Sequence, residues 1–196
     1  MHWIIGIDDG YFPYEYKGMR GTAPLVAVLG NRSLIRDLEI TKILVDVPRI
    51  DKDLTSIINS LISRNKDLEI RLVVTDSVVF AGFAIYDPWE LYSQINTPVA
   101  VIFSHQLNLL RIKSALEKHF TDHEERYSII KKAYTSSKIT KTPRGLLRIL
   151  CIGLDQDECI DIIVENQTIH KYPQPLRTAD LIASAIGRYL SIEENN

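Results

Sequence analysis

HWIIGID, at residues 2–8, is the stretch of sequence that decides the fold of this chain. It is apolar along nearly its whole length, which is typical of a central β-strand that is buried on both faces. Asp8 ends the strand, and Asp9 and Gly10 begin the loop that follows. A buried strand that ends in carboxylates indicates an α/β sheet whose edge carries functional side chains.

Two further strands follow closely, at residues 22–31 and 38–46. Their short connections predict that the first three strands form an antiparallel meander. The hydrophobic period then changes to that of an amphipathic helix over residues 51–64. Asp51 or Asp53 is expected to cap the start of this helix.

Short apolar strands then alternate with helices. Strands are predicted at residues 70–76 and 98–103, with a helix at 87–95 between them. Helical crossovers make both strands parallel to the first strand. The remaining sequence predicts a helical stretch over 107–134 that breaks near Thr121-Asp122, a strand over 146–154, and helices over 156–166 and 176–191.

This order of elements predicts a ribonuclease H-like α/β fold, a mixed sheet with strand order 3-2-1-4-5 that is flanked by helices. We expect residues 1–196 to form a single domain, because a chain of this length buries a sufficient core. Hydrophobic residues make up 45% of the sequence and charged residues 24%, the balance of a globular protein. The formal charge of −2 excludes a global basic field, although a local basic patch remains compatible with it.

The only cysteines, Cys151 and Cys159, lie in or beside apolar stretches, and the sequence contains no CxxC motif. We expect two buried free thiols, which favour a reducing compartment. The sequence has neither an apolar run of about 18 residues nor a basic segment followed by an apolar one, so we expect no membrane span and no signal peptide. The expected location is the cytoplasm, and the oligomeric state is left open.

Three carboxylates end strands of the predicted sheet: Asp8 the first strand, Asp46 the third and Asp76 the fourth. In the predicted topology all three lie at one edge, where open α/β sheets bind ligands. The first and fourth strands are neighbours, roughly 5 Å apart, so Asp8 and Asp76 are expected to share one metal ion. Asp46 lies two strands away and reaches that site only through its loop. Asp9 faces the opposite side of the strand and is expected to shape the turn.

Crowded carboxylates repel each other, and a hard cation such as Mg²⁺ relieves that repulsion through oxygen ligands. Such an ion polarises a phosphodiester and activates the attacking water. The alternative is that aspartates at strand ends only cap loops and helices. The spacing by itself leaves both interpretations open.

Several motifs of this sequence resemble the archaeal endonuclease dU family, relatives of endonuclease V. The resemblance spans most of the chain, and its more specific parts are the Phe-Ala-Gly-Phe run at 80–83 and the final helix. The motifs that carry it are Gly6-Ile7-Asp8-Asp9-Gly10 followed by Phe12, residues 76–83, residues 107–120 with Arg126, and residues 175–185.

The resemblance implies a metal-dependent DNA endonuclease that acts on strands with deaminated bases, chiefly deoxyuridine, in DNA repair. It implies that Asp8 and Asp76 hold Mg²⁺ or Mn²⁺, and that Asp46 occupies the region of a third acidic residue. Asp180 stands where the family is expected to have histidine, so it is either an added metal ligand or a solvated helix residue. Ser77 replaces an expected glycine, and together these departures imply a divergent member with altered specificity or weak activity.

Two stretches are candidates for nucleic-acid binding. Residues 131–148 contain six basic residues and no acidic one, which favours contacts with phosphates, although a solvated surface loop explains the same pattern. Tyr11 and Phe12 are expected either to stack on a displaced base or to cover the core. The remaining candidates are His105, which takes the place of the family's basic residue after strand five, with Lys131, Lys132, Lys138, Lys141, Arg144 and Arg148.

Three functional hypotheses therefore stand beside one another. The first is an endonuclease of the endonuclease V type. The second is a nucleic-acid-binding protein that kept this fold and lost the chemistry, which the departures at Ser77, His105 and Asp180 motivate. The third is hydrolysis of RNA or of a small phosphate ester at the same metal-binding edge.

Overall fold

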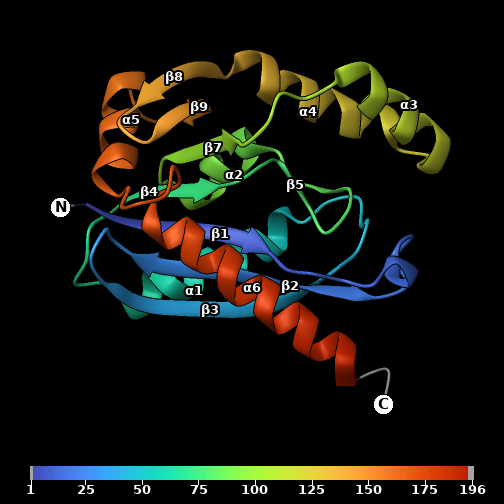
Figure 1. Ribbon diagram of the computed structural model, residues 1–196, viewed down its shortest axis with the longest axis horizontal. Coiled ribbons are helices and arrows are strands. Elements are labelled where there is room, and N and C mark those ends of the chain that lie inside the picture. The colour runs from blue at the N-terminus through green and yellow to red at the C-terminus, as the bar shows by residue number, and fades with distance from the viewer. Residues whose placement is uncertain (1, 194–196) are drawn as a thin grey trace.

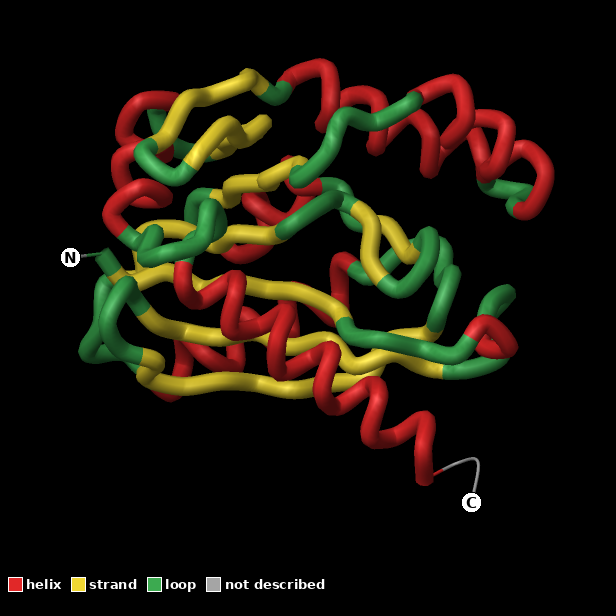
Figure 2. The backbone as a smooth tube through the Cα atoms, viewed as in Figure 1, coloured by secondary structure: helices red, strands yellow, loops and turns green. Residues whose placement is uncertain are grey.

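A mixed β-sheet with helices on both faces forms the body of the protein, as the computed structural model of residues 2–193 describes it (Figures 1 and 2). The sheet has seven strands in the order β3-β2-β1-β4-β7-β9-β8. These strands are β1 (Trp3–Asp9), β2 (Thr22–Gly30), β3 (Ile35–Leu44), β4 (Ile70–Thr75), β7 (Val99–Phe103), β8 (Lys138–Thr142) and β9 (Gly145–Ile152).

The predicted order 3-2-1-4-5 is confirmed for the first five of these strands. The pairs β1–β2 and β2–β3 are antiparallel, whereas β1–β4 and β4–β7 are parallel. The structure adds an antiparallel hairpin, β8–β9, beside β7. Only β9 is predicted by the sequence, because β8 is an edge strand whose lysines give it no apolar pattern.

The helices are α1 (Asp51–Arg64), α2 (Pro88–Ile95), α3 (Leu109–His119), α4 (His123–Ser136), α5 (Gln156–Glu165) and α6 (Gln174–Glu193). The predicted break in the long helical stretch is confirmed between α3 and α4. A 3-10 turn, η1 (Tyr14–Tyr16), interrupts the β1–β2 loop, and β5 (Val79–Phe80) pairs with β6 (Ala84–Ile85) in a small second sheet.

The two faces of the sheet follow from the alternation of side chains along β1. Ile5 and Ile7 belong to the larger core, which α1 to α4 cover. Ile4 faces the other way, into a core that α5 and the start of α6 cover. In Figure 1, α6 runs diagonally across β1 and β2, while α1 lies behind them. Asp8 follows the parity of Ile4 and therefore faces the α5–α6 side.

The cysteines depart from the expectation of free thiols. Cys151 in β9 and Cys159 in α5 form a disulfide, with a Cα–Cα distance of 6.3 Å. The reason is tertiary, because α5 folds back onto β9 and brings the two residues within disulfide range in the smaller core. The expectation of free thiols is therefore wrong, and the cysteines give no support to a reducing compartment.

Among residues 2–193, no helix combines the length and the apolar character that crossing a membrane requires.

Candidate metal centre at the edge of the sheet

The parallel pairing of β1 with β4 sets Asp8 beside Asp76. Ile7 pairs with Thr75 in this ladder, so the next residues along each strand are Asp8 and Asp76. Both carboxylates line one cavity of about 100 Å³, together with Tyr172, Leu176, Arg177 and Asp180. The structure thus brings together three of the four carboxylates predicted from the sequence.

Gly6 determines how closely α6 approaches this cavity. A Cβ atom on Gly6 would lie 2.1 Å from the backbone nitrogen of Leu176, so only glycine lets the first turn of α6 rest directly on β1. Asp180, one helical turn after Leu176, then reaches the cavity. Its carboxylate forms an ion pair with Arg177 and accepts a hydrogen bond from the Ser184 hydroxyl at 3.4 Å.

Both carboxylates of the pair hold protons more tightly than ordinary aspartates. Burial raises the pKa of Asp8 to about 8, and the negative charges of Asp9 and Asp76 add to the effect. Burial likewise raises the pKa of Asp76 to about 7, against the opposing charge of Lys171. The Oδ1 atom of Asp76 is buried and has no hydrogen-bond partner among residues 2–193.

Asp9 serves the other side of the strand, as predicted from the alternation of side chains. Its Oδ2 atom accepts a hydrogen bond from the backbone N–H of Ala81 at 3.0 Å. Its own N–H donates to Asp8 Oδ1 at 2.9 Å. Burial raises the pKa of Asp9 to about 6. Asp9 therefore fixes the turn between β5 and β6 against the end of β1.

These features fit a hard divalent cation. Two adjacent carboxylates repel each other, and one buried oxygen has no donor, so a cation between Asp8 and Asp76 satisfies both. Within the described part of the chain, no three side chains of Asp, Glu, His or Cys are already grouped as a metal-binding cluster. Two protein carboxylates with waters and substrate oxygens in the other positions are a usual set for Mg²⁺.

Asp46 is not part of this cavity. It follows β3 in a turn with a φ of 63°, and its side chain is buried. Its Oδ1 and Oδ2 atoms accept hydrogen bonds from the backbone N–H groups of Phe83 and Gly18, both at 2.9 Å. Its carboxylate thus joins the β1–β2 loop to the β5–β6 turn, and the structure gives it no contact with Asp8 or Asp76.

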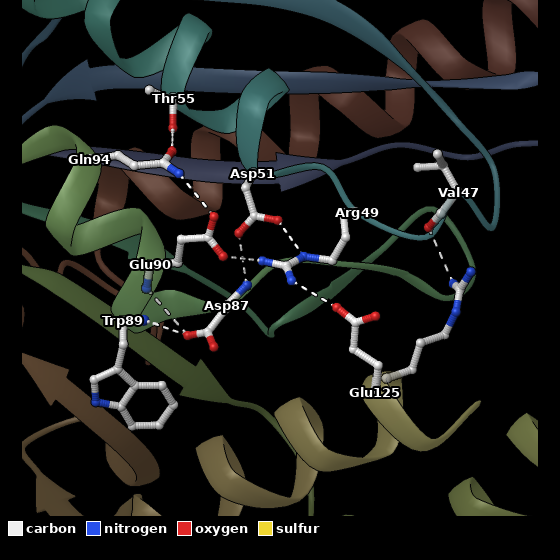
Figure 3. Close-up of polar contacts among 10 residues, drawn as sticks. Val47, Arg49, Asp51, Thr55, Asp87, Trp89, Glu90, Gln94 and Glu125 are labelled. Atoms are coloured by element: carbon white, nitrogen blue, oxygen red, sulfur yellow. Dashed lines mark hydrogen bonds and ion pairs between the residues drawn. The ribbon is translucent and has the colours of Figure 1, made fainter. Parts of the chain in front are cut away.

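Two arginines hold the loop that carries Asp46. The guanidinium of Arg126 is buried and donates to the carbonyls of Asp46, Val47 and Phe83. Arg49 bridges carboxylates of three helices (Figure 3). These are Asp51 of α1 at 2.6 Å, Glu90 of α2 at 2.6 Å and Glu125 of α4 at 3.0 Å.

The sequence suggested Asp51 as a cap of α1, but its side chain does not cap the helix. Its carboxylate instead accepts hydrogen bonds from Arg49 and from the backbone N–H of Asp87.

The aromatic candidates of the β1–β2 loop have different surroundings. Phe12 packs against the larger core. Tyr11 is half exposed, and its backbone lies against Gly187 of α6. Neither residue lines the cavity of Asp8 and Asp76, so base stacking by them stays a prediction.

A groove of about 390 Å³ lies between the end of β7 and the β8–β9 hairpin, and two of the basic candidates, His105 and Arg148, line it. His105 and the apolar side chains Ile139 and Leu146 line it, and all three are exposed. Arg148 also lines it but is engaged, because its guanidinium lies 4.6 Å from the Tyr134 ring centre and donates to Ser137. The other exposed basic side chains are Lys131 and Lys132 on α4, Lys138 and Lys141 on β8, and Arg144 in the hairpin turn.

Two residues near the carboxylate pair have no counterpart among the predictions from sequence. Tyr172 lines the cavity, and its pKa is raised to about 12 by burial and by the charge of Asp76. Lys171 is the positive charge that acts most strongly on Asp76. Both lie in an irregular segment before α6, where hydrophobic periodicity carries no signal.

Comparisons with known proteins show the family of this chain. The family model of endonuclease dU matches residues 2–187. A UPF0215 protein of Sulfurisphaera tokodaii is 33% identical over 187 residues, which cover 95% of this chain and 96% of the relative.

Solved structures share the fold at lower identity. A protein of unknown function from Archaeoglobus fulgidus superposes with a TM-score of 0.79 at 20% identity, covering 95% of this chain and 98% of that one. Endonuclease V of Ciona intestinalis, solved with a 24mer DNA that contains an inosine followed by a ribo-adenosine, has a TM-score of 0.64 at 12% identity, covering 96% and 87%. The predicted ribonuclease H-like fold is confirmed by these likenesses. Since the family match extends over nearly the whole sequence, the chain belongs to the endonuclease dU family.

Proposed function

We propose that this protein is a metal-dependent endonuclease of the endonuclease V type that nicks DNA strands carrying deaminated bases, chiefly deoxyuridine. The observation that carries the proposal is the carboxylate pair. Asp8 near the end of β1 and Asp76 directly after β4 lie at the ends of adjacent parallel strands, line one small cavity and share raised pKa values. Carboxylates with raised pKa values at the edge where α/β sheets bind ligands are typical of a functional site.

In this proposal Asp8 and Asp76 are the two metal ligands. A bound Mg²⁺ or Mn²⁺ supplies the charge that polarises the phosphodiester and activates the attacking water. Asp9 holds the β5–β6 turn in place through Ala81, and Asp180 remains paired with Arg177. The DNA-bound Ciona intestinalis relative and the exposed basic side chains of β8–β9 support DNA as the substrate.

Nicking of labelled DNA strands tests the proposal. Purified protein with Mn²⁺ is expected to nick a strand that contains deoxyuridine or deoxyinosine, and to leave a matched strand without the lesion largely intact. Asp8→Asn removes one ligand charge and is expected to lower the rate at least about 1,000-fold. Asp67→Asn, an exposed aspartate in the turn before β4, serves as the matched control and is expected to nick normally.

The second candidate is a nucleic-acid-binding protein without cleavage. The observation that favours it is Asp180, which stands where the family is expected to have histidine and forms an ion pair with Arg177. Such a protein binds the same strands with equal affinity in EDTA and in Mn²⁺. The absence of nicking together with metal-independent binding would decide for this candidate and against the endonuclease.

A further inference from the structure

Lys171 is a cation beside the carboxylate site, and its charge acts on Asp76. Its ammonium group lies 3.4 Å from the carbonyl oxygen of Ser104, just beyond β7, and 5.1 Å from the ring centre of Tyr172. Tyr172 lines the cavity of Asp8 and Asp76. Lys171 therefore stands at the rim of the proposed metal site, between the ends of β4 and β7.

The two cations near the cavity, Arg177 and Lys171, differ in their partners. Arg177, the other cation beside it, is held in an ion pair by Asp180. The ammonium group of Lys171, by contrast, contacts a carbonyl and an aromatic ring within residues 2–193, and no carboxylate is bonded to it. Within residues 2–193, Lys171 is thus the cation beside the cavity that no ion pair holds.

A buried glutamine fixes the segment that carries Lys171. The side chain of Gln167 is almost fully buried, and its amide group donates to the backbone carbonyl of Lys171. The same amide group donates to the Thr142 hydroxyl at 3.2 Å. Thr142 in turn donates to the Gly145 carbonyl at 2.9 Å and so organises the turn of the β8–β9 hairpin. One side chain therefore joins the Lys171 segment to the basic hairpin.

The register of the sheet shows where this hairpin points. Phe103, the last residue of β7, pairs with Arg148, and the turn begins three residues further along at Gly145. At about 3.3 Å per residue, the turn extends roughly 10 Å past the end of β7. Lys141 and Arg144 therefore project beyond the same edge of the sheet that carries Asp76.

We propose that Lys171 and the basic side chains of the β8–β9 hairpin form one phosphate-binding track for a DNA strand, in which Lys171 contacts the phosphate that lies over Asp8 and Asp76. The track rests on the proposed function, because it assigns the residues that hold the substrate of that site. Lysine binds phosphate as a point charge, so it stabilises negative charge that develops on the reacting phosphodiester. The hairpin holds the strand further along, where its contacts add affinity and no sequence preference.

Variants of Lys171 test the catalytic end of the track. K171M is expected to lower the nicking rate at saturating DNA by about 100-fold, and K171R to restore most of the rate. The affinity for Mn²⁺, measured by electron paramagnetic resonance, is expected to stay equal or to increase, because a positive charge beside Asp76 has been removed. K66M, in the turn between α1 and β4 at the opposite edge of the sheet, is the matched control and is expected to behave as the unchanged protein.

The double variant K141M/R144M tests the other end. We measure binding of a fluorescein-labelled 24-nucleotide deoxyuridine strand in Ca²⁺ at several salt concentrations. The slope of log affinity against log salt is expected to fall by about 1.4 for the two lost phosphate contacts, and by about 0.7 for K171M. The nicking rate of the double variant at saturating DNA is expected to stay within about twofold of normal, because its residues lie away from the carboxylates.

The outcomes separate the track from the proposed function. Normal nicking by K171M, or a loss of Mn²⁺ binding that matches its loss of rate, would overturn the role of Lys171 while leaving the endonuclease intact. Equal salt slopes for K171M, K141M/R144M and K66M would overturn the track. If the unchanged protein nicks no strand, the proposed function fails, and the salt slopes still decide whether these residues contact phosphates.

Discussion

Asp8→Asn is expected to make the metal-free protein more stable at pH 8, although it removes a ligand of the proposed metal site. Burial and neighbouring charges raise the pKa of Asp8 from 3.8 to about 8 in the folded state. The folded state therefore binds this proton more tightly than the unfolded state does. As the pH rises from about 4 to about 8, the unfolded state loses the proton first, so the free energy of unfolding falls across that window. Asparagine carries no charge and avoids this loss.

We expect a gain of about 5 kcal/mol for Asp8→Asn at pH 8 and of about 1.5 kcal/mol at pH 5, because at pH 5 the pH has risen only about one unit above the pKa of the unfolded state. For a chain of this size the gain at pH 8 raises Tm by roughly 10–20 °C. Thermal melts in EDTA at both pH values measure it, with Asp67→Asn as the control for an exposed carboxylate. With Mn²⁺ the order reverses, because only the unchanged protein gains stability from the ion. A metal-free Asp8→Asn protein that is less stable at pH 8 than the unchanged one would contradict the description of this site.

Gly6→Ala is expected to cost more stability than any substitution on the surface. The added methyl group would lie 2.1 Å from the nitrogen and 2.4 Å from the Cα atom of Leu176, and 2.5 Å from the carbonyl carbon of Pro175. These are backbone atoms, so the start of α6 has to move as a unit. We expect a loss of about 3 kcal/mol in the free energy of unfolding, measured by urea denaturation. The same movement carries Asp180 and Tyr172 away from Asp8 and weakens Mn²⁺ binding.

Gly18→Ala is the matched control for this substitution. Gly18 has a φ of 71° and open space around its Cα atom, so alanine there meets only the backbone cost of the left-handed region, about 1 kcal/mol. A loss for Gly6→Ala that is no larger than the loss for Gly18→Ala would mean that α6 does not rest on β1 as described.

The sequence predicted the carboxylate pair because Asp8 lies at the end of β1 and Asp76 directly follows β4. Alternation along β1 places Asp8 on the opposite face from Asp9, and the parallel crossover places Asp76 beside Asp8. Asp46 lies outside the regular elements. β3 ends at Leu44, and the residues after it form a turn that closes through backbone N–H groups of Gly18 and Phe83. The loops that contain Gly18 and Phe83 have no hydrophobic periodicity. The sequence therefore does not reveal which side chain accepts hydrogen bonds from their backbone N–H groups.

The other departures have the same origin. The disulfide of Cys151 and Cys159 depends on the packing of α5 against β9, which the predicted elements do not specify. Lys171 reaches the site through Gln167, whose contacts join segments 25 residues apart in the sequence. Long-range side-chain contacts of this kind follow from the tertiary fold and leave no local pattern.

In the proposed function, Asp8 and Asp76 together hold one divalent metal ion. A crystal of this protein grown with Mn²⁺, measured for anomalous scattering, tests it most directly. We expect a single strong peak roughly 2.1 Å from a carboxylate oxygen of each residue, including the Oδ1 atom of Asp76. A peak at the acidic groups around Arg49 instead, or no peak beside Asp8 at a concentration of Mn²⁺ that supports nicking, would contradict it.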